Sequence, residues 1–189
     1  MKLFSIIAPC RNERDHIHAF VQSICAQQLP EGWQMELLIA DGMSDDGTVE
    51  QLQLLVAKDD RIKAVANPGR IVSTGMNACL AQARGEVILR MDLHTTYADD
   101  YVAQCIATLA RTGTDNVGGP WVAEGDGAMQ RAIAAAFQSR WVVGGARSRD
   151  HGGAVVVERV LVEVAMRVDQ RHDRRRRHQI GDAWPSRDA

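Results

Sequence analysis

Apolar and polar residues alternate in blocks along the first 110 residues, and the blocks predict strands and helices in turn. Short apolar runs predict strands at residues 3–8, 35–40, 61–66 and 86–91. After each run, apolar residues recur at helical spacing and predict helices at about 12–28, 49–56, 71–83 and 101–109. This alternation favours βαβ units, so we expect an α/β fold with a mostly parallel sheet and helices on both faces.

Several residues at the element boundaries carry conformational signals. Pro9 is expected to end the first strand, because proline cannot donate a hydrogen bond to a neighbouring strand. Asn12 is expected to cap the following helix, with Glu13 and Asp15 in its first turn. Gly85 is expected to close the third helix from the position just after its C-cap.

Polar residues gather where three of the predicted strands end. They are Arg11, Asn12 and Glu13 after the first strand, Asp41 after the second, and Asp92 with His94 after the fourth. Ligands of open α/β sheets bind at the carboxyl ends of the strands. We therefore expect the functional site at this edge of the sheet.

The first strand is not followed by a glycine-rich phosphate loop. The residues after it form neither Gly-x-Gly-x-x-Gly nor Gly-Lys-Ser/Thr, which disfavours dinucleotide oxidoreductases and P-loop NTPases. A bound diphosphate would then need a metal ion. Asp92 is the first candidate ligand, because a carboxylate at the end of an apolar strand would otherwise lie at the edge of the core with its charge uncompensated. In an extended backbone His94 would point to the same face as Asp92, and a nitrogen ligand favours Mn²⁺ over Mg²⁺.

Composition and charge narrow the class of protein. The chain is 46% hydrophobic and 24% charged with a net charge of -2, which is typical of a soluble globular protein and gives no support to a nucleic-acid partner. Its four cysteines form no Cys-x-x-Cys pair, so we expect reduced, mostly buried thiols. The apolar run before Arg11 is too short for a signal peptide or a membrane span. We expect a cytoplasmic protein that reaches the inner face of a membrane only through partners.

Five short motifs between residues 3 and 105 resemble those of family 2 glycosyltransferases with the GT-A fold. The opening Pro-Thr-Tyr-Asn-Glu appears as Pro9-Cys10-Arg11-Asn12-Glu13, and the Asp-Asp-Gly-Ser-Thr-Asp-Gly-Thr loop appears at residues 41–48. Asn67-Pro68-Gly69-Arg70, Gly75-Met76-Asn77 and Ala83-Arg84-Gly85-Glu86 match three further motifs, and Asp92-Leu93-His94 stands at the Asp-x-Asp metal motif. With Gly118-Gly119-Pro120-Trp121, the chain is most similar to glycosyltransferases of succinoglycan-type exopolysaccharide synthesis.

The resemblance implies an inverting enzyme that transfers a sugar from a nucleoside diphosphate, expected to be UDP, to a saccharide or lipid-linked acceptor. It implies donor contacts at Pro9, Arg11, Asn12, Glu13, Asp41, Asp46, Arg70 and Asn77, and a divalent metal, Mn²⁺ or Mg²⁺, at Asp92 and His94. Asp41 would face the base and Arg70 the base or phosphate. These residue types suit the roles, since a carboxylate can accept a hydrogen bond from a uracil N–H and the guanidinium fork matches phosphate.

Simpler structural roles remain open for several of these residues. Asn12 can cap the first helix, and Asp46 or Thr48 can cap the second. Arg70 can be a solvated turn residue. Asp92 can be a turn or capping carboxylate, and His94 can lie on the surface or support the ligands without binding metal.

The resemblance also implies a carboxylate base in a Glu-Asp or Asp-Asp motif, beyond a segment like Gly144-Gly145-Ala146-Arg147. The sequence after residue 147 contains neither pair. Glu124 and Asp126 precede that position in a glycine-rich loop, so the base is unassigned.

The composition of the chain changes near Arg147. Residues 147–189 hold ten Arg, no Lys and seven acidic residues, whereas residues 1–146 carry a net charge of -5. We expect a GT-A core at 1–146, incomplete on the acceptor side, and an atypical tail at 147–189 that is off-frame or disordered. A basic arm for nucleic acid or an anionic membrane is the alternative for the tail. A non-catalytic nucleotide-sugar-binding fragment is the alternative to an active glycosyltransferase.

Overall fold

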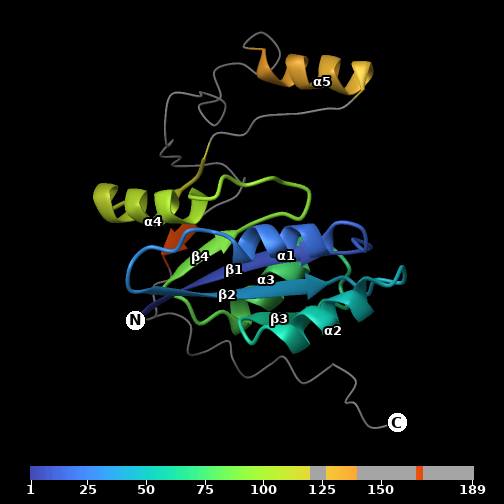
Figure 1. Ribbon diagram of the computed structural model, residues 1–189, viewed down its shortest axis with the longest axis horizontal. Helices are drawn as coiled ribbons and strands as arrows, with labels where there is room; N and C mark the ends of the chain where they lie inside the picture. Colours follow the sequence, from blue (N-terminus) through green and yellow to red (C-terminus); the bar gives the residue numbers. More distant parts are fainter. Residues whose placement is uncertain (120–126, 140–164, 168–189) are drawn as a thin grey trace.

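A mostly parallel sheet forms the centre of the molecule (Figure 1). The computed structural model describes residues 1–119, 127–139 and 165–167. The strands in these ranges are β1 (Lys2–Cys10), β2 (Trp33–Asp41), β3 (Ile62–Ala66), β4 (Val87–Arg90), β5 (Asn116–Val117) and β6 (Ala165–Arg167). Their spatial order is β3-β2-β1-β4-β6-β5; β1 to β4 are parallel, and β6 is antiparallel to both β4 and β5. The expected α/β architecture is confirmed.

Helices cover both faces of this sheet, as the hydrophobic pattern predicted. The helices of the described ranges are α1 (Ile17–Cys25), α2 (Thr48–Lys58), α3 (Val72–Gln82), α4 (Tyr101–Thr112) and α5 (Ala128–Gln138). Phe20 of α1, Leu52 of α2 and Val102 of α4 belong to one core cluster with one face of the strands. Cys79 of α3 belongs to a second cluster on the opposite face. None of the helices in the described ranges has the length and apolar character needed to cross a membrane.

Residues of β1 alternate between the two cores. Phe4, Ile6 and Ala8 lie in the cluster beneath α1, α2 and α4, whereas Ile7 lies in the cluster beneath α3. A strand covered on both faces needs apolar residues at consecutive positions, which explains the unbroken run in the sequence. Burying one such isoleucine contributes roughly 1.5–3 kcal/mol.

β1 continues through Pro9 to Cys10, one residue beyond the proline that was expected to end it. The pairing of β1 with β4 stops at Ile7, while the pairing with β2 runs on to Cys10. The backbone polar groups of residue 9 point toward the β4 side, as those of Ile7 do. The pairing with β4 has already stopped there, so the N–H that Pro9 lacks would have had no partner in that strand. The proline is tolerated because only one of its sides is paired.

Two further boundary expectations are wrong. Asn12 does not cap α1, which begins at Ile17, and Glu13 and Asp15 precede the helix rather than lying in its first turn. Gly85 follows α3 at a close approach to β1: a Cβ there would lie 2.5 Å from the backbone nitrogen of Ser5. The sequence therefore needs glycine at 85 for space between two backbones, and not to end the helix.

An ionic network centred on the buried carboxylate of Glu36 joins β1, β2 and β3. The Glu36 carboxylate accepts hydrogen bonds from Ser5 Oγ at 2.7 Å, Lys63 Nζ at 2.8 Å and the Arg84 N–H at 2.6 Å. Burial alone would raise the pKa of Glu36, but these donors outweigh it and lower the pKa to about 2.

The four cysteines are free thiols, and three of them, Cys10, Cys79 and Cys105, are buried.

Candidate functional site

The loops that follow β1 and β2 are held together by hydrogen bonds at the carboxyl edge of the sheet. Asn12 donates from Nδ2 to Asp45 Oδ1 at 3.0 Å and accepts from the Asp45 N–H at 3.1 Å. The Glu13 N–H donates to Thr48 Oγ1 at 2.8 Å. Asn12 has a φ of 56°, a left-handed conformation that asparagine adopts more readily than most residues. Asn12 therefore fixes the geometry of this edge instead of capping a helix.

Asp41 is the buried anchor of the same edge. Its Oδ1 accepts a hydrogen bond from Ser44 Oγ at 2.6 Å, and its Oδ2 accepts one from the Ser44 N–H at 3.2 Å. Ser44 Oγ in turn accepts the Asn12 N–H at 2.8 Å. These contacts offset the cost of burying the carboxylate, and each oxygen keeps a second lone pair for a further donor.

Asp46 lies just before Gly47, the N-cap of α2, and its side chain holds the first residue of that helix. Its Oδ1 accepts from the Thr48 N–H at 3.0 Å, and its Oδ2 accepts from the Arg14 N–H at 3.2 Å. The hydrogen bond from the Thr48 hydroxyl lowers the pKa of Asp46 and outweighs the opposing effect of burial. The Asp46 carboxylate thus satisfies donors at the start of α2, where Gly47 has no side chain to do so.

Arg11 and Arg70 meet at the exposed rim. Arg11 Nη1 donates to the backbone oxygen of Arg70 at 3.5 Å, and the Arg11 side chain passes over Gly42, where a Cβ would lie 3.2 Å from it. Arg70 has a φ of 58° and donates its N–H to the Asn67 carbonyl at 3.0 Å, so it does occupy a turn. Pro9 is half-buried near the end of β1, and Asn77 is exposed in the middle of α3. Two guanidinium groups therefore face solvent at the carboxyl edge.

The structure separates the side chains of Asp92 and His94. β4 ends at Arg90, and residues 93–94 form a turn in which the Thr95 N–H donates to the Asp92 carbonyl at 3.2 Å. The Asp92 carboxylate accepts from Arg90 Nε at 3.1 Å and Nη2 at 2.9 Å. The extended geometry expected for residues 92–94 is therefore wrong, because the turn directs the two side chains to different partners.

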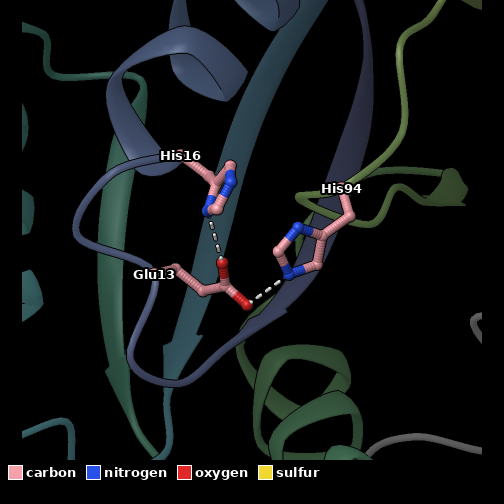
Figure 2. A group of neighbouring side chains, drawn as sticks. All are labelled: Glu13, His16 and His94. Atoms are coloured by element: carbon pink, nitrogen blue, oxygen red, sulfur yellow. Dashed lines mark hydrogen bonds and ion pairs between the residues drawn. The ribbon is translucent and has the colours of Figure 1, made fainter. Parts of the chain in front are cut away.

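His94 instead meets Glu13 and a histidine that the sequence reasoning missed (Figure 2). His94 Nε2 lies 2.7 Å from Glu13 Oε1, and His16 Nδ1 lies 3.2 Å from Glu13 Oε2. The two imidazole rings are in edge contact, with centroids 4.7 Å apart. The available signal was the spacing of three between Glu13 and His16, which brings both side chains to one side of a helical turn.

Cys10 lies under this edge but is not suited to act as a nucleophile. Burial, with Asp41, Glu13 and Asp46 nearby, raises the pKa of the Cys10 thiol well above its ordinary value. Glu124, Asp126 and the 144–147 segment lie outside the described residues. The carboxylate base is therefore still unassigned.

Residues 5–179 match the family described as Glycosyl transferase family 2. The chain belongs to glycosyltransferase family 2. The match includes much of segment 147–189, of which the structure describes β6; the off-frame origin of that segment stays a prediction.

Two relatives of this chain are named for the biosynthesis of succinoglycan and of teichuronic acid. The chain is 34% identical over 146 residues to the succinoglycan biosynthesis protein ExoA of Rhizobium meliloti (strain 1021), covering 76% of this chain and 44% of ExoA. It is 35% identical over 101 residues to the putative teichuronic acid biosynthesis glycosyltransferase TuaG of Bacillus subtilis (strain 168), covering 52% of this chain and 38% of TuaG. The predicted resemblance to succinoglycan-type glycosyltransferases is confirmed. The chain spans less than half the length of either relative.

Solved structures of glycosyltransferases share the GT-A fold with this chain. S. aureus TarS residues 1–349 in complex with UDP align with a TM-score of 0.55 at 24% identity, over 68% of this chain and 38% of TarS. The mannosyltransferase PcManGT from Pyrobaculum calidifontis, in complex with GDP-Man and Mn²⁺, aligns with a TM-score of 0.56 at 23% identity, over 61% of this chain and 34% of PcManGT. The GT-A fold expected from the motifs is therefore confirmed.

Proposed function

We propose that this chain binds the nucleotide-sugar donor of a metal-dependent, inverting glycosyltransferase that builds a cell-surface glycan. The observation that carries the proposal is the joining of the β1, β2 and β4 loops into one polar edge, through Asn12 to Asp45 and Glu13 to His94. In a parallel α/β sheet this is the edge at which nucleotides bind. Membership of the family supplies the reaction class.

The donor is proposed to be a UDP-sugar. TarS has been solved with UDP and with UDP-GlcNAc, which supports uridine, whereas PcManGT has been solved with GDP-Man. Both nucleotides present a diphosphate and an N–H on the base ring. A carboxylate such as Asp41 can accept from that N–H, so a direct comparison of UDP with GDP has to decide between them.

The residues divide into those that touch the donor and those that shape its pocket. Asp41 would face the base beside Pro9, and the guanidinium groups of Arg11 and Arg70 would face base or phosphate. Asn12 and Asp46 hold the loops in place through the hydrogen bonds described above. Asn77 is proposed as a further donor contact from α3.

The residues at the edge fit a divalent cation. His94 Nε2 lies against a carboxylate oxygen of Glu13, and Asp92 is 35% exposed with Arg90 as its counter-charge. A cation held at Asp92, with His94 turned away from Glu13 to join it, would supply positive charge to the departing diphosphate. Arg90 keeps the Asp92 charge compensated in the free protein.

The acceptor is proposed to be a saccharide or a lipid-linked saccharide, held at the membrane through partners. ExoA and TuaG are named for succinoglycan and teichuronic acid biosynthesis, which supports a saccharide acceptor. A non-catalytic nucleotide-sugar-binding protein is the second candidate, and the observation that favours it is that the sequence after residue 147 contains neither Glu-Asp nor Asp-Asp, so the base is unassigned. Release of UDP that depends on acceptor would support transfer; donor binding with no transfer to any acceptor would support the second candidate.

Thermal unfolding with Mn²⁺ and a panel of UDP- and GDP-sugars tests the donor site. Ligand at about 100 times its dissociation constant stabilises the folded state by about 2.7 kcal/mol, so Tm should rise. Asp92→Ala should abolish the rise, whereas Asp99→Ala, an exposed residue before α4, should retain it. No rise with any nucleotide sugar would refute the donor site, and equal rises for both variants would refute the role of Asp92.

A further inference from the structure

We propose that Glu13, His16 and His94 form a three-ligand site for a transition-metal ion, which binds the protein in the absence of nucleotide. The proposal rests on the proposed function for its place beside the donor. Metal binding alone can still be measured separately. His16 lies outside every motif that suggested the donor site, and it distinguishes this proposal from a metal held at Asp92 and His94.

The three side chains converge from two separate loops (Figure 2). Glu13 and His16 belong to the segment between β1 and α1, and His94 belongs to the turn after β4. One ligand atom from each residue lies within 4.8 Å of the other two. Glu13 stands between the two imidazoles, with one carboxylate oxygen toward each ring.

The donor atoms indicate the class of metal. Two imidazole nitrogens and one carboxylate oxygen suit Zn²⁺, Co²⁺ or Mn²⁺ better than Mg²⁺ or Ca²⁺, which prefer oxygen ligands. Three protein ligands also leave positions open for water or for phosphate oxygens. A site of this composition can therefore bind a metal first and a diphosphate second.

Small side-chain rotations are sufficient to close the site. Metal–ligand bonds of about 2.0–2.2 Å require the donor atoms to lie roughly 3–3.5 Å apart. The 2.7 Å separation of His94 Nε2 and Glu13 Oε1 must open slightly, and the wider separations must contract. His16 and His94 have 56% and 62% of their side chains exposed, so both rings can turn without disturbing the core.

Glu13 supplies a second, independent observation. Its side chain is only 15% exposed, and Oε2 is shielded from solvent with no well-directed hydrogen bond among the described residues. His16 Nδ1 approaches this atom at 3.2 Å, but in a direction that does not satisfy it. A shielded carboxylate oxygen without a donor is costly, and a bound cation would remove that cost.

Calorimetric titration of the nucleotide-free full chain with Zn²⁺, repeated with Co²⁺ and its visible absorption, tests the site. We expect saturable binding that weakens by at least about tenfold in Glu13→Gln, His16→Gln and His94→Gln. His18→Gln removes an exposed histidine of α1 outside the cluster and should bind like the wild type. Unchanged thermal unfolding of the metal-free variants would show that each is folded.

Two results would overturn the site: wild-type affinity in His16→Gln, or no metal binding by the nucleotide-free chain. If UDP still binds in Mg²⁺ while the free chain binds no Zn²⁺ or Co²⁺, this site is refuted and the proposed function stands. If Zn²⁺ binds through His16 but no nucleotide binds afterwards, the site stands and the proposed function is refuted.

Discussion

Glu13 and His94 are 81 residues apart in the sequence, yet Oε1 of Glu13 lies 2.7 Å from Nε2 of His94. Parallel pairing of β1 with β4 brings them together, because Ile7 is in register with Arg90 and both strands end toward the same edge. The loops that follow therefore start side by side. Contacts of this kind make the edge a single site with residues from three loops.

Asn12 should contribute to stability through both its backbone conformation and its side chain. Asn12→Ala loses the two hydrogen bonds to Asp45 and places alanine at a φ of 56°, so we expect a loss of about 1–2 kcal/mol in the free energy of unfolding. Asn12→Gly loses the same bonds but tolerates the φ, and its loss should be smaller. Urea denaturation of the two variants measures the difference. Equal losses would contradict a backbone contribution.

Glu36 should make stability depend on pH in acid. Its pKa is lowered in the folded state from an ordinary value of 4.5 to about 2, so its stabilising contribution is complete above pH 4.5 and is lost as pH falls toward 2. A shift of this size corresponds to about 3 kcal/mol. Glu36→Gln should therefore be less stable than the wild type at pH 7, and the gap should narrow as pH falls. A constant gap between pH 7 and pH 2.5 in urea denaturation would contradict the network.

Gly85 should be intolerant of any side chain. In Gly85→Ala the new methyl group would lie 2.5 Å from the Ser5 nitrogen and 2.7 Å from the Phe4 carbonyl carbon, both backbone atoms of a central strand. We expect a loss of about 2–3 kcal/mol. Gly113→Ala is the control: it has a φ of +69° but nothing within 4 Å, and it should lose only about 1 kcal/mol. If Gly113→Ala proves the more damaging in guanidinium denaturation, close approach is not the reason for Gly85.

Arg11 should contribute to donor binding without contributing to stability. Its guanidinium is exposed and has one long contact, at 3.5 Å, with the Arg70 carbonyl. Because a charge-assisted hydrogen bond to phosphate adds about 1.5–3 kcal/mol, Arg11→Gln should weaken UDP binding by about tenfold or more and leave Tm of the free chain unchanged. Arg111→Gln, at the exposed end of α4, is the matched control. Equal UDP affinities in the two variants would remove Arg11 from the site.

Sequence patterns predicted the sheet and its edge because these follow from local periodicity. The run at residues 35–40 and the helical spacing around Leu52 each describe one element, and parallel connection of such elements leaves little freedom in the topology. The motif after β1 and the loop at 41–48 predicted the edge at which the structure joins these loops by hydrogen bonds.

Side-chain partners were less predictable because they depend on turns. A turn at residues 93–94 directs His94 away from Asp92, and no period in the sequence reports that turn. Asn12 was predicted to cap a helix because asparagine is a favoured N-cap residue. Asparagine also adopts a left-handed φ more readily than most residues, and this is the conformation that Asn12 has. His16 was missed because its only sequence signal, a spacing of three from Glu13, does not show that His94 from another loop completes the cluster.

Calorimetric titration of the Mn²⁺-loaded chain with UDP, beside GDP and ADP, tests donor binding most directly. We expect one saturable UDP site, weaker binding of GDP and ADP, and loss of UDP binding in Asp41→Ala. Asp45→Ala is the control, because it removes only a loop contact with Asn12 and should retain UDP binding. Absence of binding heat for UDP and GDP at every Mn²⁺ concentration tested, with the chain folded, would contradict the nucleotide-sugar site.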